Sequence, residues 1–289
     1  MHPVEEPPAA TPDGFRRRAA GTRGALWTAN LALAGRSGLA LVAEDRGWQA
    51  ALAARYGAFL VDQPGPGWPV LALESSETPP PTRSLLADLA ASTVDTVSDQ
   101  GSLTLEHPRF RVAIDRRRRR GALRGPRHRF PVDAVVRHLL AEEPGTLLVH
   151  GAVLVAGERA WVAAGDSGRG KTTLAGLLPE CACCDELGLI EERDGGWQAR
   201  STPFWHGRPA TGRLRAVHLL EHGASHRADR LAPAAAAREL ARQVVWPDWW
   251  PERVDAALER LARLVERVPV FRLRFRPDRD VLAVLEEAA

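Results

Sequence analysis

The segment Gly165–Thr172 has the residue types and spacing of a loop that binds phosphate groups. It reads GDSGRGKT and fits the pattern G-x-x-x-x-G-K-[ST] in full. Glycines let the backbone approach phosphate oxygens closely, and the free N–H groups at a helix start attract an anion. Lys171 would place its charge on the β- and γ-phosphates, and Thr172 would offer a hydroxyl group to Mg²⁺. The sequence therefore predicts a nucleotide-phosphate site, with a chance glycine-rich turn as the alternative; its residues are Gly165, Asp166, Ser167, Gly168, Arg169, Gly170, Lys171, Thr172 and Thr173.

The composition of the chain singles out the same loop. Lysine and arginine together number 39, and Lys171 is the single lysine among them. A compact ammonium group and a planar guanidinium group are not interchangeable in a narrow loop. We therefore expect that this position could not accept the arginine that fills the other cationic positions. Because arginine is favoured throughout the chain, its abundance is weak support for nucleic-acid binding.

Asp185 and Glu186 form the next acidic pair along the chain. An acid at a strand end near a phosphate-binding loop can hold Mg²⁺ or take a proton from an attacking hydroxyl group. One helix, one turn and one strand separate Lys171 from this pair. We therefore expect the pair on the strand that directly follows the helix of the loop. The alternative is a plain pair of acids at a strand end.

Several segments together resemble the catalytic domain of HPr kinase/phosphorylase and its bacterial HPr-kinase-like relatives. The short spacing from Lys171 to the acidic pair is also similar to that of ATP-dependent phosphoenolpyruvate carboxykinase, of the same structural superfamily. The resemblance covers residues 146–289, and the N-terminal half resembles only the variable front part of these relatives. The segments that carry it are HGA at 150–152, GDSGRGKTTLAGLL from Gly165, CCDELGLI at 183–190, STPFWHG at 201–207 and VPVFRLRFRPD at 268–278.

The resemblance implies a kinase that uses ATP and Mg²⁺. Asp185 is then implied to be the base that activates an acceptor serine or other hydroxyl group, and Thr172, Asp185 and Glu186 are implied to lie at the metal. The family usually has aspartate at the position of Glu186. His150 is implied to neighbour the catalytic acid, whereas by itself it would be a lone packed histidine. The implied acceptor is a peptide, a small protein or a small molecule.

Two other classes of function stay open on the residues. One is a nucleotide-sensing module that binds without transfer, which would tolerate the loss of Asp185 and His150. The other is an NTP hydrolase that drives a conformational switch. ATP turnover without an acceptor would favour the hydrolase, and tight binding without turnover would favour the sensor.

The elements that must position these residues follow from the hydrophobic periodicity of the second half. Residues 146–289 alternate strand and helix patterns, which predicts an α/β domain on a mixed or parallel sheet. By resemblance, this is a P-loop kinase domain of the HPr-kinase and phosphoenolpyruvate-carboxykinase type. Within it, 146–157 reads as two apolar runs with a break, 181–192 as one strand, and 233–246 and 251–268 as two helices.

The first half predicts a smaller α+β region that presents the acceptor or regulates the enzyme. It spans residues 13–145, and residues 1–12 predict a disordered leader. The proline run 79–81 predicts a loop. The predicted strands and helices include strands at 38–44, 69–74, 102–107 and 110–115, and helices at 48–60 and 130–143.

Cysteine and histidine positions do not predict a metal site. The cysteines of 181–184 lack a second ligand pair, and we expect them to be small buried residues of a core strand rather than a metal or redox site. His218, His222 and His226 recur every four residues. Their segment has the pattern of a strand, which would not place them on one helical face.

Charged and aromatic clusters have two interpretations each. The arginine run 116–120 predicts a solvated hairpin tip, with docking of an acidic partner or of nucleic acid as the alternatives. The aromatic segment 204–206 could line a pocket or pack in the core. The tryptophan-rich segment 246–250 could pack between helices or form a docking surface.

The bulk properties exclude some protein classes. A chain of 289 residues with 45% hydrophobic and 26% charged residues is not a fully disordered protein, and its length suits one large domain or two small ones. The N-terminus lacks the pattern of a secretory signal, and no apolar stretch reaches the roughly 18 residues of a membrane span. With an odd number of cysteines, we expect a cytoplasmic protein. We expect no nucleic-acid or membrane partner, and the sequence is compatible with a homo-oligomer.

Overall fold

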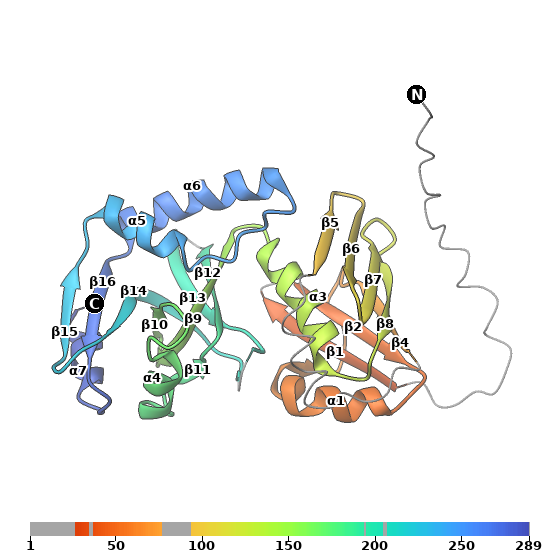
Figure 1. Cartoon of the computed structure of the whole chain (residues 1–289), viewed down its shortest axis with the longest axis horizontal. Coiled ribbons are helices and arrows are strands. Elements are labelled where there is room, and N and C mark those ends of the chain that lie inside the picture. The colour runs from red at the N-terminus through yellow and green to blue at the C-terminus, as the bar shows by residue number, and fades with distance from the viewer. Residues whose placement is uncertain (1–26, 35–36, 77–93, 194, 205–206, 289) are drawn as a thin grey trace, which may run out of the picture.

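The computed structural model describes residues 27–34, 37–76, 94–193, 195–204 and 207–288 (Figure 1). The predicted leader 1–12 and the proline run 79–81 lie outside these residues. The described chain is mixed α/β, with two mixed eight-stranded sheets and few helices. No described helix combines the length and the apolar character that a membrane span requires.

The first sheet is built from the N-terminal half, in the order β3-β1-β2-β4-β8-β7-β6-β5. Its β2–β4 and β4–β8 pairs are parallel and the others are antiparallel. Helices α1 (Gly47–Tyr56) and α3 (Arg129–Ala141) bury their apolar side chains against it, and a short 3-10 helix, η2 (Gly57–Phe59), follows α1. The strands are β1 (Trp27–Ala34), β2 (Ser37–Ala43), β3 (Leu60–Val61), β4 (Val70–Ser75), β5 (Asp95–Ser98), β6 (Ser102–His107), β7 (Phe110–Asp115) and β8 (Arg120–Gly125).

The second sheet comes from the C-terminal half, in the order β10-β9-β12-β13-β14-β16-β15, and β11 pairs with β9. An additional parallel pairing between β10 and β14 closes five of these strands, β10, β9, β12, β13 and β14, into a ring. The strands are β9 (Thr146–Ala156), β10 (Arg159–Ala164), β11 (Ala182–Cys184), β12 (Leu187–Arg193), β13 (Gly196–Ser201), β14 (Thr211–His222), β15 (Arg227–Arg230) and β16 (Val270–Phe275).

Helices cover the second sheet from two directions. Helices α5 (Pro233–Ala241) and α6 (Pro251–Arg267) pack on one hydrophobic cluster. Helices α4 (Lys171–Leu177) and α7 (Val281–Glu287) pack on another. Figure 1 shows α6 lying along one side of this sheet, with α4 at the opposite end of the strands. The predicted strand and helix alternation over 146–289 is therefore present as an α/β arrangement on a mixed sheet.

Three predicted boundaries in this half are wrong. The helix predicted at 233–246 is α5, which ends at Ala241. Residues 146–156 form one unbroken strand, because Gly151 does not break β9. It lies opposite Ala164 of β10, where an added Cβ would come within 3.1 Å of the Ala163 carbonyl oxygen, so the glycine permits close approach of two backbones. Residues 181–192 form two strands, β11 and β12, separated by a bend at Asp185 and Glu186.

The two halves share one hydrophobic cluster. Leu148, Leu187, Leu189 and Phe204 of the second half belong to the same buried cluster as the core of the first sheet. Helix α3 lies between the two sheets in Figure 1. The predicted boundary between residues 145 and 146 falls in the short connection from α3 to β9.

The tryptophan-rich segment 246–250 joins α5 to α6 and packs against the N-terminal half. Trp249 Nε1 donates a hydrogen bond of 2.7 Å to Glu142 Oε1, and its ring lies 4.3 Å from that of His138. The Trp250 ring lies under the Arg116 guanidinium group at 5.3 Å. Trp249 and Trp250 therefore pack against the region around the end of α3, whereas the prediction was packing between the two helices that the segment joins.

The arginine run begins in a hairpin turn, as predicted. Strand β7 ends at Asp115 and β8 begins at Arg120. Residues 117–120 are exposed, whereas Arg116 is part-buried and forms an ion pair with the buried carboxylate of Glu142. One arginine of the run therefore serves the contact between the halves.

Candidate functional site

The predicted phosphate-binding residues form a tight loop between β10 and α4. Gly168 and Gly170 have φ values of +81° and +98°, in the left-handed region that favours glycine. An added Cβ at Gly170 would lie 2.8 Å from the Phe275 ring. The segment Gly165–Gly170, which we call the glycine-rich loop, therefore depends on glycine for both its backbone conformation and its packing.

Lys171 begins α4 and points its ammonium group into the glycine-rich loop. Nζ donates hydrogen bonds of 2.6 Å to the Gly165 carbonyl and 3.1 Å to the Asp166 carbonyl. The residue is only 8% exposed. Burial lowers the pKa of the ammonium group below its ordinary value, and nearby carboxylates oppose this shift, those of Asp166, Asp185 and Glu186. The lone lysine is thus a partly desolvated cation held at the centre of the loop.

Two side chains outside the predicted set hold the glycine-rich loop in place. Gln243 Nε2 donates to Asp166 Oδ1 at 2.9 Å, and His222 Nε2 lies 2.7 Å from the Gly168 carbonyl oxygen. The main-chain carbonyl of Gln243 in turn accepts a 2.6 Å hydrogen bond from the His150 backbone N–H. These contacts join residues far apart in the sequence, and no local pattern indicates them.

Asp185 lies in the bend between β11 and β12, with its side chain buried. It is 8% exposed, and its Oδ1 has no hydrogen-bond partner among the residues that the structure describes. A buried carboxylate oxygen without a donor is unfavourable unless a proton, a cation or a ligand group satisfies it. Its charge acts on the ammonium group of Lys171, so the two groups predicted to work together lie within electrostatic range.

Glu186 follows Asp185 and faces the N-terminal half. Arg55 Nη2 lies 3.7 Å from Glu186 Oε2. Burial raises the pKa of the Glu186 carboxyl group above its ordinary value, and the charge of Arg55 opposes this shift. Arg55 itself is held by Asp133 of α3 at 3.3 Å and lies over the Phe204 ring at 5.3 Å. The first half of the chain therefore contributes to the surroundings of the acidic pair, which sequence reasoning did not foresee.

His150 lies on β9, directly opposite Leu187 at the start of β12. The adjacent Gly151 donates its N–H to the Glu186 carbonyl at 3.0 Å, which ties β9 to the acidic bend. Burial lowers the pKa of the imidazole, and the charges of Lys171 and Arg137 lower it further. His150 is therefore expected to be neutral at pH 7 and able to accept a hydrogen bond.

The residues predicted to hold a metal are brought together only in part. Thr172 and Thr173 lie exposed on the first turn of α4. Among the described residues, no group of three or more His, Cys, Asp or Glu side chains has the arrangement of a metal site. Asp185 and Glu186 supply carboxylate oxygens near the loop, and a magnesium ion bound with nucleotide takes most of its ligands from phosphates and water.

The other histidines and cysteines serve separate structural roles. His218 is fully buried on β14 against Phe271, and burial lowers its pKa to about 3. His226 pairs with Asp278 at 2.7 Å. The cysteines of 181–184 are free and buried in and beside β11. Phe204 is buried in the core, and 205–206 lie outside the described residues.

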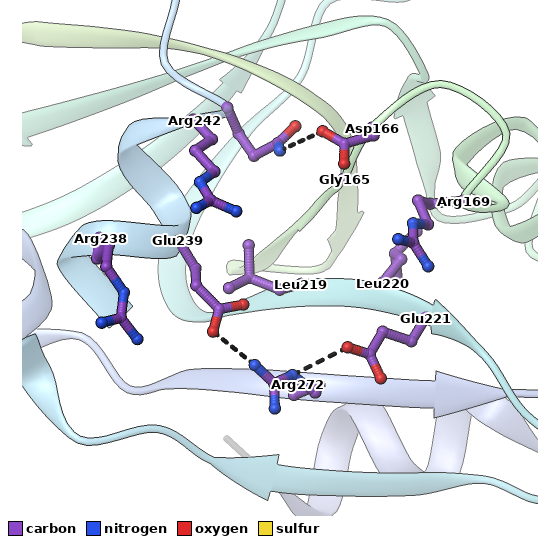
Figure 2. Close-up of a pocket in the computed structure, with 11 residues that line it drawn as sticks. Gly165, Asp166, Arg169, Leu219, Leu220, Glu221, Arg238, Glu239, Arg242 and Arg272 are labelled. Carbon is purple, nitrogen blue, oxygen red and sulfur yellow. Dashed lines mark hydrogen bonds and ion pairs between the residues drawn. The ribbon is translucent and has the colours of Figure 1, made fainter. Parts of the chain in front are cut away.

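A pocket of about 510 Å³ opens beside the glycine-rich loop. It lies at the carboxyl ends of the parallel strands β10, β14 and β16, under the end of α5 (Figure 2). This is the edge at which α/β sheets bind ligands. Its lining residues are Gly165, Asp166, Arg169, Leu219, Leu220, Glu221, Arg238, Glu239, Arg242, Gln243 and Arg272.

Comparison of the sequence with family models and with curated proteins gave no match.

Proposed function

We propose that this protein is an ATP- and Mg²⁺-dependent phosphotransferase of the HPr-kinase-like type. The observation that carries the proposal is the buried Lys171 ammonium group, held by carbonyl oxygens inside a loop with left-handed glycines at the start of a helix. Such a loop offers backbone N–H groups and one cation to a phosphate chain. The acceptor in this proposal is a hydroxyl group of a peptide, a small protein or a small molecule.

The glycine-rich loop and Lys171 bind the donor in this mechanism. The loop N–H groups surround the phosphates, and Lys171 directs its third N–H toward the oxygens of the β- and γ-phosphates, because two of its three donors already bind loop carbonyls. His222 and Gln243 hold the loop by their contacts to Gly168 and Asp166. The loop is thereby organised before the nucleotide binds, which favours electrostatic catalysis.

The residues near the loop fit a magnesium ion bound together with ATP. The Asp185 carboxylate oxygen without a partner, the exposed Thr172 hydroxyl group and the part-buried Glu186 carboxylate are the oxygen ligands that Mg²⁺ prefers. When bound, the ion would neutralise negative charge on the transferring phosphoryl group. The Glu186 carboxylate also lies near the Arg55 guanidinium group, and this ion pair limits the movement of the Glu186 side chain.

Asp185 is the proposed general base. Its carboxylate takes the proton of the acceptor hydroxyl group while the acceptor oxygen forms a bond to the γ-phosphorus of ATP. The bond from that phosphorus to the bridging oxygen breaks, and ADP leaves with the electron pair. The neutral His150 lies beside the acidic bend and can accept a hydrogen bond from the acceptor or from a water molecule.

Transfer of labelled phosphate from ATP tests this proposal. The purified chain is incubated with γ-labelled ATP, Mg²⁺ and a library of serine- and threonine-containing peptides, together with free serine and glycerol. We expect Asp185→Asn to lower transfer by about 100-fold or more while nucleotide binding stays within about threefold of wild type. Asp95→Asn, which removes an exposed carboxylate on β5, is the matched control.

Three results would contradict parts of the proposal. Transfer by Asp185→Asn at the wild-type rate would show that another group is the base. ATP turnover that needs no acceptor would favour a hydrolase. Nucleotide binding without any turnover, unaffected by Asp185→Asn, would favour a sensing module.

A further inference from the structure

The pocket beside the glycine-rich loop contains three arginines that bind no other side chain. Arg169, Arg238 and Arg242 form neither an ion pair nor a side-chain hydrogen bond within the described ranges, and Figure 2 shows all three around the cavity. They come from two elements. Arg169 belongs to the loop, and Arg238 and Arg242 lie one turn apart at the carboxyl end of α5.

The carboxylates of the same pocket are already engaged. Glu221 and Glu239 both bind Arg272, at 3.0 Å and 2.5 Å. Asp166 accepts the hydrogen bond of Gln243. Figure 2 shows these three interactions as dashed lines. The pocket lining holds four arginines and three carboxylates, so it has an excess of one positive charge.

Arg169, Arg238 and Arg242 are exposed, so water weakens their mutual repulsion, and an anion between them would offset what remains of it. The carboxyl end of α5 offsets part of this cost for Arg238 and Arg242, but it does not reach Arg169 on the other side of the pocket. Guanidinium groups are the side chains best suited to bind phosphate oxygens in pairs. The charge arrangement thus matches an anionic ligand.

The pocket shares Gly165, Asp166 and Arg169 with the glycine-rich loop, but its lining does not include the acidic bend at Asp185 and Glu186. Strand β10 carries the glycine-rich loop and pairs with β9 on one edge and with β14 on the other. The acidic bend adjoins β9 through the Gly151 contact, whereas the pocket lies over the ends of β14 and β16. Gln243 lines the pocket and binds Asp166 of the loop. At about 510 Å³ the pocket can hold an organic molecule and not only an ion.

We propose that Arg169, Arg238 and Arg242 form a second anion site, which binds a phosphate ester other than the transferred group. The ligand is a phosphorylated small molecule whose phosphate lies between α5 and the glycine-rich loop. Its source is either the outer part of the nucleotide itself or a separate phosphorylated molecule. The site does not depend on phosphoryl transfer, so it can be tested even if the protein has no kinase activity.

Calorimetric titration separates these sources. The probes are ADP with Mg²⁺, and ribose 5-phosphate with and without saturating ADP. The variant is Arg238→Gln/Arg242→Gln, in which both exposed side chains can change without disturbing the core. The control is Arg117→Gln/Arg118→Gln, which removes the same charge from the exposed β7–β8 hairpin. We expect the pocket variant to weaken binding of the cognate probe at least tenfold relative to the control.

The outcomes of these titrations support or refute the second anion site as follows. Ribose 5-phosphate that binds together with ADP, and is lost only in the pocket variant, assigns the site to a separate phosphorylated molecule. Exclusion of ribose 5-phosphate by ADP, with ADP itself weakened tenfold in the pocket variant, assigns it to the nucleotide. Arginine-dependent binding of ribose 5-phosphate without any ADP binding would keep the site and refute the proposed kinase. If the pocket variant binds both probes as the control does, or if neither probe binds wild type, the inference is wrong.

Discussion

Removal of the Lys171 ammonium group is the sharpest test of the glycine-rich loop. Lys171→Met keeps the length of the side chain and removes the charge and its two hydrogen bonds to the Gly165 and Asp166 carbonyls. Methionine is apolar and flexible, so it can remain in a position that is 8% exposed. We therefore expect the variant to fold, with a melting temperature lowered by the loss of the donor to the two carbonyls.

The loss of nucleotide affinity can be estimated from the geometry. Two of the three ammonium donors bind loop carbonyls, which leaves one for a phosphate oxygen. A hydrogen bond to a charged group contributes about 1.5–3 kcal/mol, which corresponds to about 10- to 150-fold in Kd. Titration with ADP and Mg²⁺ measures this ratio, and Arg117→Met is the control for the loss of one positive charge.

Lys171→Arg separates charge from shape in the same assay. A guanidinium group keeps the charge, but it is larger and planar and cannot occupy the space of an ammonium group between two carbonyl oxygens. We expect it to weaken ADP binding by a factor similar to that of Lys171→Met. The reasoning is refuted if either variant, correctly folded by circular dichroism, binds ADP within about threefold of wild type.

Three further predictions concern stability, each measured by urea unfolding at equilibrium. Gly170→Ala should lower the free energy of unfolding by about 1–3 kcal/mol, because it strains a backbone with φ of +98° and crowds the Phe275 ring. The control Gly176→Ala in α4, where an added Cβ meets nothing within 4 Å, should be neutral or stabilising. Equal effects of the two substitutions would contradict the strain argument. Trp249→Phe should lower the free energy of unfolding by about 1–2 kcal/mol, because the buried Glu142 carboxylate loses its 2.7 Å hydrogen-bond donor. An unchanged unfolding midpoint would show that this hydrogen bond does not stabilise the fold. His218 has a folded-state pKa of about 3, so as the pH falls below 6.5 the imidazole of the unfolded chain takes up a proton first. The free energy of unfolding of wild type should therefore fall by about 2 kcal/mol by pH 5, whereas that of His218→Leu should not show this fall. Parallel pH profiles of the two proteins would count against a neutral buried imidazole.

Periodicity predicted most of the elements, because the apolar side chains that define each strand or helix also form its buried face. The segments predicted as strands at 38–44 and 69–74 are β2 and β4, and the helix predicted at 130–143 is α3 with small shifts at its ends. One of its errors was caused by a glycine. Gly151 suggests a break by its type, but it lies inside β9, where β10 approaches closely.

The candidate site was predictable only where its residues follow each other along the chain. The glycine-rich loop and the acidic pair lie on contiguous segments, and their predicted proximity agrees with the electrostatic effect of Asp185 on Lys171. Arg55, His222 and Gln243 reach the site from distant elements. Their positions follow from the packing of the sheets, and a single sequence carries no signal for such contacts.

The pairing of β10 with β14 has a consequence for the order in which the protein folds. Strand β10, which ends at the glycine-rich loop, gains its second neighbour only when Ala164 lies opposite Leu219. During synthesis the loop therefore leaves the ribosome well before the strand that completes its support. Contacts this distant in sequence form slowly, because a long loop must close first. We expect the loop to acquire its final shape only once β14 is in place, so that a chain truncated before β14 would lack the supported loop.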